Sequence, residues 1–353
     1  MQRSTILALA LSTLAACGGS TTDPVDTTTP PQTGVSNTPG TTNRTVTVQG
    51  LTREFVVHVG ATVGAKVAVP IVFMNHGTSG DGPQFFNTSG WREKADAEGF
   101  IAVFPSALTH CLHEDENNDG DFTDAGEQHV TTKWAHGELG DPARMPLCTA
   151  AEVAALIASN RALVNHPLAD DLAFFDAMVS YLKQNYVVDP KAIYVSGFSN
   201  GSQMANRLAV DRSVVFAATA GHAGGISVPT IASRAISAVL TLGTRDDRVL
   251  TPLAITAIPL GESTLAQYPL IPFVFIQPML TQLRLTSAYI YDEPTINGKR
   301  ASRWTFRTST VGASNSLSFT LLEDNTHSYP NGSNHPVVMA NVLWPFFKAQ
   351  RLP

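Results

Sequence analysis

The chain has 353 residues, of which 43% are hydrophobic and 15% charged, and its formal net charge at pH 7 is -6. After removal of an N-terminal segment this length suits one large α/β domain. The acidic balance and the lack of a long basic run argue against nucleic-acid binding, so no nucleic-acid partner is expected.

The N-terminal segment predicts export. Residues 6–14 form an apolar stretch too short to span a bilayer, and the Leu-Ala-Ala-Cys run ending at Cys17 reads as a lipobox. We expect residues 1–16 to be a lipoprotein signal peptide and Cys17 to carry a lipid anchor to the outer membrane or cell surface, unless the protein is released extracellularly. A plain secretory signal with an incidental cysteine is the alternative. Residues 17–43, rich in Thr, Pro and Gly, predict a flexible tether, and residues 44–353 the folded domain.

The first half of this domain alternates between predicted strands and helices. Residues 45–48 and 54–59 alternate polar and apolar side chains, as antiparallel edge strands do. Residues 67–74 and 100–104 are nearly continuous apolar runs, typical of strands buried on both faces of a mostly parallel sheet. Residues 91–98, between these two runs, predict a helix.

The second half continues the alternation. Its predicted elements are a helix over 170–186, a strand over 192–195, a helix over 202–210, strands over 238–242, 304–307 and 318–322, and a closing helix over 335–349. This order predicts a doubly wound α/β domain, with helices on both faces of a mostly parallel sheet. Residues 108–168 and 250–300 read as insertions, which commonly shape a substrate cleft.

The run Gly197-Phe198-Ser199-Asn200-Gly201 directly follows an apolar strand and precedes a helical stretch. Two glycines let the chain turn sharply, so that a serine hydroxyl stands exposed at the end of the sheet. This context predicts a nucleophile elbow at Ser199. An ordinary glycine-rich turn is the alternative.

A serine hydroxyl becomes a nucleophile when a histidine accepts its proton and an acid orients that histidine. In the elbow arrangement the chain order is serine, acid, histidine. Only His327 and His335 follow Asp247 in the chain. His327 comes directly after a predicted strand, where the base is expected, whereas a capping or surface role is expected for His335. Asp246 and Asp247 both follow a strand, and Asp247 is expected to be a turn or cap residue.

The negative charge that forms on an attacked carbonyl oxygen needs backbone N–H donors. One is expected from Asn200, the residue after the nucleophile. The other is expected from the loop after residues 67–74, with Thr78 the first candidate and Ser79 the next. His76, Ser79 and Tyr329 are expected at the substrate cleft, His76 as a loop-orienting residue rather than a base.

These motifs resemble the polyhydroxybutyrate depolymerase and feruloyl or acetylxylan esterase family of α/β-hydrolases over roughly residues 45–350. The segments that carry the resemblance are 75–77, 90–91, 99–105, 188–201, 243–246 and 327–330. The resemblance implies the α/β-hydrolase fold, Ser199 as nucleophile, Asp246 as acid and His327 as base. The chain departs from the family pattern at Thr78, Ser202 and Tyr329, where the family often has cysteine, glycine and tryptophan.

The resemblance further implies a serine ester hydrolase that works through an acyl-enzyme without a catalytic cofactor. Polyester or hydroxyalkanoate oligomers and synthetic polyesters are the expected substrates, and feruloyl or acetylxylan esters of plant walls are the alternative. A surface-binding lipoprotein with a hydrolase fold is the non-enzymatic alternative. The oligomeric state and the acyl-chain preference are left open.

An acidic stretch in the first insertion is similar to an EF-hand loop. Its candidate ligands for a structural calcium ion are Asp115, Asn117, Asp119, Asp121 and Glu127, with the last one position later than that pattern requires. A merely solvated acidic loop is the alternative. Cys111 and Cys148 bracket this stretch, and in an exported protein they predict a disulfide rather than two separate thiols.

Overall fold

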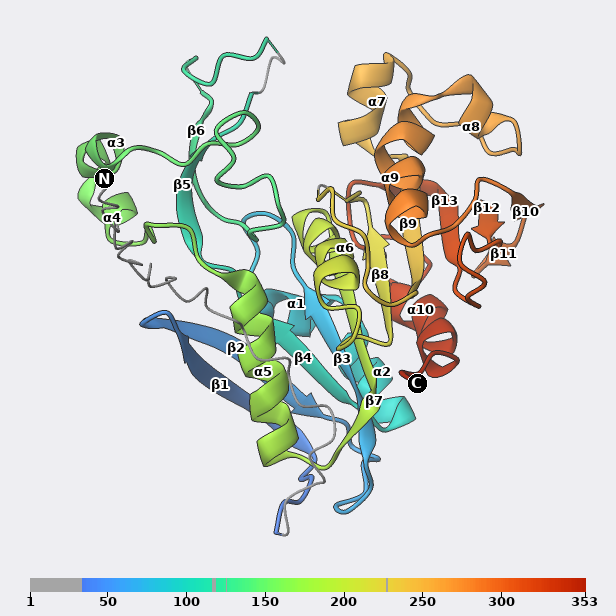
Figure 1. Cartoon of the computed structure of the whole chain (residues 1–353), viewed down its shortest axis with the longest axis horizontal. Coiled ribbons are helices and arrows are strands. Elements are labelled where there is room, and N and C mark those ends of the chain that lie inside the picture. Colours follow the sequence, from blue (N-terminus) through green and yellow to red (C-terminus); the bar gives the residue numbers. More distant parts are fainter. Residues whose placement is uncertain (1–33, 116–118, 125, 227) are drawn as a thin grey trace, which may run out of the picture.

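The computed structural model describes residues 34–115, 119–124, 126–226 and 228–353 (Figure 1). Within these ranges one sheet of eleven strands runs through the molecule, in the order β1-β2-β4-β3-β7-β8-β9-β13-β12-β10, with β11 paired to β12. The strands β4, β3, β7, β8, β9 and β13 are parallel to one another, and the strands at both ends of the sheet pair antiparallel. A separate antiparallel pair, β5 and β6, lies in the first insertion.

The strands of the described residues have the following bounds. They are β1 (Gly40–Val48), β2 (Leu51–Val59), β3 (Val69–Asn75), β4 (Ile101–Pro105), β5 (Thr109–His113), β6 (Gln128–Thr132), β7 (Val188–Phe198), β8 (Ala218–His222), β9 (Ser237–Arg245), β10 (Tyr289–Asp292), β11 (Thr295–Ile296), β12 (Lys299–Phe306) and β13 (Leu317–Thr326).

The helices connect and cover these strands. They are α1 (Gly82–Thr88), α2 (Trp91–Glu98), α3 (Ala150–Ala155), α4 (Ala158–Arg161), α5 (Asp171–Asn185), α6 (Asn200–Asp211), α7 (Asp247–Leu253), α8 (Thr264–Gln267), the π-helical turn η1 (Pro272–Ile276), α9 (Gln277–Gln282) and α10 (Met339–Lys348). Among the described residues, no helix combines the length and the apolar character needed to cross a bilayer.

Two apolar cores hold the helices against the sheet, one on each face. Because successive strand residues point to opposite faces, Phe73 belongs to one core and its neighbour Met74 to the other. The first core takes in the apolar side chains of α5 and α6, which lie in front of the central strands in Figure 1. The second core takes in those of α2 and α10. This strand order, with parallel central strands between two helical layers, is the α/β-hydrolase fold.

The predicted boundaries need three corrections. Strand β1 begins at Gly40, inside the predicted tether, and Asn37 is buried with its side chain bonded to both backbone groups of Val187. The folded domain therefore begins before residue 44.

The closing helix starts at Met339 rather than at His335, because Pro336 disfavours helical backbone at the residue before it. Strand β8, which is made largely of small residues, had no apolar run to predict it.

The first insertion is held by a disulfide. Cys111, on β5, is bonded to Cys148 with a Cα–Cα distance of 5.3 Å. The helices α3 and α4 follow Cys148 and lead back to α5. The second insertion contributes α8, η1, α9 and the outer strands β10 and β11, and its buried residues Phe275 and Met279 join the first core.

Candidate active site

Ser199 occupies a strained backbone position between β7 and α6. Its φ of 51° and ψ of -122° lie where residues with a side chain are rarely found, as in a nucleophile elbow. Both flanking glycines are required by close backbone contacts. A Cβ atom at Gly197 would lie 2.0 Å from the carbonyl oxygen of Gly201, and one at Gly201 would lie 2.3 Å from that of His76.

The structure joins Ser199, His327 and Asp246 into one hydrogen-bonded chain. Oγ of Ser199 lies 2.9 Å from Nε2 of His327, and Nδ1 of His327 lies 3.0 Å from both carboxylate oxygens of Asp246. The Asp246 side chain is 1% exposed, whereas that of His327 is 20% exposed. The acid is therefore shielded from water while the histidine remains accessible to a substrate.

The sheet explains why three residues so far apart in the sequence meet. Ser199 follows β7, Asp246 follows β9, and His327 follows β13. These strands are parallel and, with β8, adjacent in the sheet, so their carboxyl ends share one edge. The site lies at that edge.

The structure also distinguishes Asp246 from its neighbour Asp247, and His327 from the other late histidine, His335. Asp246 caps α7 by accepting the Arg248 backbone N–H at 3.1 Å, which fixes its carboxylate. The cap role predicted for Asp247 therefore belongs to Asp246, and Asp247 is exposed in the first turn of the helix. His335 is buried and lies 2.9 Å from the carbonyl oxygen of Glu323 through Nε2. It therefore holds the backbone beside β13 and takes no part in the hydrogen-bonded chain at Ser199.

The loop after β3 lies against Ser199. A Cβ atom on Gly77 would come within 3.3 Å of the Ser199 Cβ atom. The Ser79 N–H donates to the carbonyl oxygen of Thr132 at 3.0 Å, so it is not available to an oxyanion. For the Thr78 N–H, the described part of the chain provides no acceptor, and Asn200 sits at the first position of α6. The backbone N–H groups of Thr78 and Asn200 thus stay the candidates for an oxyanion site beside Ser199.

Two of the residues expected at the cleft are buried, which corrects that prediction. His76 is fully buried; its Nδ1–H donates to the Gly77 carbonyl at 2.6 Å and its Nε2 accepts the Ala107 N–H at 3.0 Å. Burial lowers the pKa of His76 to about 4, so the ring is neutral at neutral pH. The role of His76 is to shape the loop, as expected, without lining the cleft. Ser79 is exposed.

Tyr329 also lies beneath the site rather than in its cleft. Its ring packs against Phe198, and its hydroxyl accepts a hydrogen bond from Nε1 of Trp91 at 3.0 Å. Burial raises the pKa of Tyr329 to about 12. The polar end of this side chain thus faces the second core, where it satisfies the indole N–H of a buried tryptophan.

A hydrogen-bond network that was not predicted from the sequence connects the first insertion to Asn200, the residue after Ser199. The Trp134 backbone N–H donates to Oδ1 of Asn200 at 2.7 Å, and the Trp134 indole N–H donates to the His76 carbonyl at 2.9 Å. Nδ1 of His136 lies 2.9 Å from Nδ2 of Asn200 and 3.0 Å from the Trp134 carbonyl oxygen, and its Nε2 lies 3.2 Å from Glu138. Short-range sequence patterns carry no signal for these contacts.

His222 is a second buried histidine close to the site that the sequence did not single out. Its carbonyl oxygen accepts the Ser199 N–H at 2.8 Å, and its Nδ1 lies 2.7 Å from the hydroxyl of Thr241. The ring stacks on Phe198, whose own ring contacts that of His327. Burial lowers the pKa of His222 to about 4. A neutral ring therefore supports the backbone from which the nucleophile projects.

The acidic loop has its own hydrogen bonds. Asp115 accepts the backbone N–H groups of Asp119 and Gly120, and Asp121 accepts that of Thr123. Glu127 is buried. Asn117 and Cys17 lie outside the described residues.

One group of candidate metal ligands gathers among the described residues. It consists of His113, Cys148 and Glu152, and the sulfur of Cys148 is already in the disulfide. Calcium binding by the acidic loop therefore stays a prediction.

Solved structures that are similar to this chain include three that are described as esterases. They include an acetyl xylan esterase from Aspergillus awamori, with 14% identity, a TM-score of 0.48, and coverage of 87% of this chain and 99% of that one. A thermostable esterase shows 13% identity, a TM-score of 0.47, and coverage of 88% and 63%. A CE1 ferulic acid esterase from Anaeromyces mucronatus shows 11% identity, a TM-score of 0.43, and coverage of 90% and 93%.

No family model matches the chain, and no curated protein matches it.

Proposed function

We propose that this chain is a serine carboxylic-ester hydrolase that works through an acyl-enzyme. The observation that carries the proposal is the continuous hydrogen-bonded chain from Ser199 through His327 to the buried carboxylate of Asp246. Such a chain activates a hydroxyl nucleophile near neutral pH.

The geometry assigns each group a step. Nε2 of His327 takes the proton of Ser199 as Oγ attacks the ester carbonyl carbon, and the Thr78 and Asn200 N–H groups hold the resulting oxyanion. His327 then protonates the departing alcohol, which leaves an acyl group on Ser199. A water molecule, deprotonated by His327, attacks this acyl-enzyme. His327 then returns that proton to Oγ of Ser199 as the acyl bond breaks and the acid leaves, while Asp246 keeps the imidazole in the correct orientation throughout.

A groove between the two insertions supports an extended substrate. It has a volume of about 870 Å³, and Ser199, Asp246 and His327 are not among its lining residues. Its link to the site is Gln203, one helical turn after Ser199 on α6. One side carries apolar residues of the second insertion, including Phe273 and Val274, whose exposed fractions are 66% and 39%. Exposed apolar side chains in a groove favour an apolar acyl group or a polymer surface. We therefore propose polyester or hydroxyalkanoate oligomers, or synthetic polyesters, as the substrate class.

The other side of the same groove favours a second candidate. It carries the charged residues Glu138, Asp141 and Arg144 from the first insertion. Charged side chains suit the hydroxyl groups of a sugar, so a feruloyl or acetyl ester of a plant-wall polysaccharide is the alternative substrate.

We also propose that the mature protein is held at the outer membrane or cell surface by a lipid on Cys17. The support for this anchor is the lipobox sequence that ends at Cys17 and the tether-like composition that follows it.

Turnover of a panel of esters tests the activity and chooses between the substrates. The panel contains p-nitrophenyl butyrate, methyl ferulate, acetylated xylan, a polyhydroxybutyrate film and a polyethylene terephthalate film, each with Ser199→Ala as the blank. We expect Ser199-dependent turnover that is fastest on the polyesters or their oligomers. Preference for methyl ferulate or acetylated xylan would select the alternative, and silence across the panel from folded protein would refute the ester hydrolase.

A further inference from the structure

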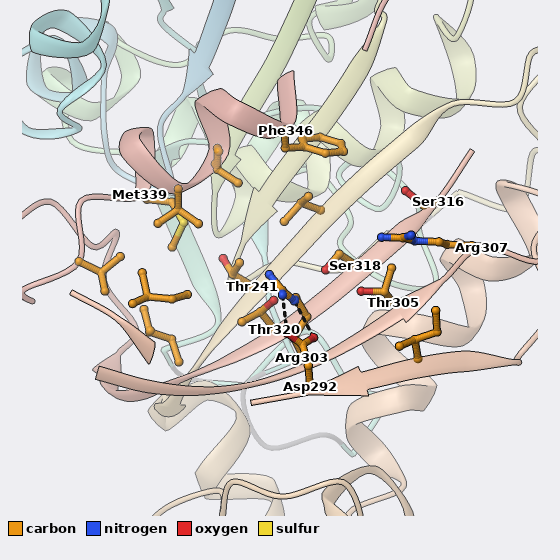
Figure 2. Close-up of a pocket in the computed structure, with 17 residues that line it drawn as sticks. Thr241, Asp292, Arg303, Thr305, Arg307, Ser316, Ser318, Thr320, Met339 and Phe346 are labelled. Carbon is orange, nitrogen blue, oxygen red and sulfur yellow. Dashed lines mark hydrogen bonds and ion pairs between the residues drawn. The ribbon is translucent and has the colours of Figure 1, made fainter. Parts of the chain in front are cut away.

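A second concave site lies on the sheet beside α10 and shares no lining residue with the groove between the two insertions (Figure 2). It has a volume of about 480 Å³, within the range of small-molecule pockets. Its floor is one face of β9, β13, β12 and β10, and one wall is α10. We call it the α10 groove.

Strand register explains the chemistry of this floor. Thr305 pairs with Ser318, and Arg303 pairs with Thr320, so these four side chains share one face of the sheet. The residues between them, such as Trp304, point to the other face and are buried in the first core. The floor of the α10 groove is therefore polar although the sheet beneath it is well packed.

The hydroxyl groups on this floor are available to a ligand. Within the described ranges, the side-chain hydroxyls of Thr305, Ser318 and Thr320 have no protein hydrogen-bond partner, and none of these three oxygen atoms is shut off from solvent. A ligand in the groove can therefore reach them. Three hydroxyls on adjacent strands can together serve one polar group.

The charges in the groove favour a singly charged anion. Its lining contains three charged side chains, those of Arg303, Arg307 and Asp292. Arg303 is paired with Asp292, its Nε donating to Oδ1 at 2.9 Å, whereas Arg307 has no acidic partner in the described part of the chain. In Figure 2 the guanidinium of Arg307 extends toward Ser318. The groove thus carries one uncompensated positive charge, in the planar form that suits a carboxylate.

The helix wall supplies the complementary apolar surface. Met339, Val342, Leu343 and Phe346 of α10 line it, and Figure 2 shows Met339 and Phe346 on the helix side of the groove. An apolar wall opposite a single free arginine fits a molecule with one anionic end and one apolar end.

We propose that the α10 groove binds an amphiphilic monocarboxylate, an organic acid of medium chain length. Arg307 and the floor hydroxyls hold the carboxylate, and the aliphatic chain packs on α10. This binding is separate from the proposed chemistry at Ser199, so it stands or fails independently of the ester hydrolase.

Calorimetric titration with octanoate tests the proposal, with acetate and octan-1-ol as probes that lack the chain or the charge. We expect octanoate to bind and Arg307→Gln to weaken it by about tenfold, the loss of one charge-assisted contact. Acetate and octan-1-ol should each bind at least about tenfold more weakly than octanoate, because each keeps only one of the two contacts. Arg300→Gln is the matched control: Arg300 lies on β12, which Arg307 directly follows, and it pairs with Glu323 and is not part of the groove lining.

Three outcomes would overturn the proposal. The first is no binding of octanoate at millimolar concentration, and the second is octan-1-ol binding as tightly as octanoate. The third is octanoate binding that is unchanged by Arg307→Gln and competes with ester turnover, which would place the acid at Ser199. Because Arg307 is exposed and has no ion-pair partner in the described ranges, its substitution leaves the fold intact.

Discussion

The side chain of Asn200 accepts a hydrogen bond from the backbone N–H of Trp134 at 2.7 Å, across 66 residues of sequence. This bond, with the one from Asn200 to His136, fastens the first insertion to the residue that follows the nucleophile. Asn200 thus offers its backbone N–H to the proposed oxyanion site, and its side chain holds the segment around Trp134 and His136 in place.

Asn200→Ala should therefore lower both stability and activity. It leaves the buried Trp134 N–H without its acceptor, which costs about 1–3 kcal/mol of unfolding free energy. We expect a matching loss in urea unfolding and a lower kcat for p-nitrophenyl butyrate. Gln184→Ala, at an exposed position of α5 where the side chain contacts Ser180 of the same helix, is the control and should keep the stability. Equal stability of the two variants would contradict a structural role for the Asn200 side chain.

The choice of acid is tested by a pair of neighbouring substitutions. Asp246→Asn removes the charge that orients His327, and by analogy with other serine triads kcat should fall about 10⁴-fold. Asp247→Asn changes an exposed carboxylate one residue away and should leave kcat within about threefold of the wild type. A large loss in the Asp247 variant alone would reverse the assignment.

The buried histidines predict that stability falls in mild acid. Burial lowers the pKa of His76 and His222 to about 4, whereas each titrates near 6.5 when unfolded. Between these values the unfolded chain binds more protons than the folded one, so the unfolding free energy decreases as the pH falls. From about pH 7.5 to about pH 5 we expect a loss of about 2 kcal/mol for each ring.

His222→Gln checks this origin of the pH dependence. With one of the two rings removed, about half of that loss should disappear when urea unfolding is compared at the two pH values. An unchanged slope in the variant would show that other groups cause it.

Chelation tests the predicted calcium site. If the acidic loop at residues 115–127 holds calcium, the ion stabilises the folded state, and EDTA should lower the melting temperature until calcium is restored. Magnesium, which prefers a tighter octahedral site, should restore it less well. A melting temperature insensitive to EDTA would favour a solvated acidic loop.

The residues around Ser199 show which parts of the site can be predicted from sequence. Ser199 and His327 were selected by local patterns, because each follows a strand and the required chain order left few alternatives. The choice of Asp246 over Asp247 came from the family resemblance, because both residues follow the same strand. That Tyr329 points into the core was not predictable. Its position in a loop beside His327 says nothing about side-chain direction, which depends on packing against Trp91, 238 residues away in sequence.

Strands whose composition depends on contacts with residues distant in sequence were also not predicted. Strands with continuous apolar runs, such as β3, were predicted to within two residues, because burial on both faces leaves a clear pattern. Strand β8 has the sequence Ala-Thr-Ala-Gly-His and carries no such pattern. Its small residues are explained by tertiary contact: a Cβ atom at Gly221 would lie 2.0 Å from the hydroxyl oxygen of Ser202.

Covalent labelling with a fluorophosphonate, followed by mass spectrometry, tests the central claim most directly. The hydrogen-bonded chain at Ser199 predicts one adduct per molecule, located on Ser199, with hydrolysis of p-nitrophenyl butyrate lost in proportion to labelling. Folded Ser199→Ala should take up no label and show no hydrolysis. An adduct on a different serine, or full hydrolysis by the Ser199→Ala protein, would contradict the proposed nucleophile and the mechanism built on it.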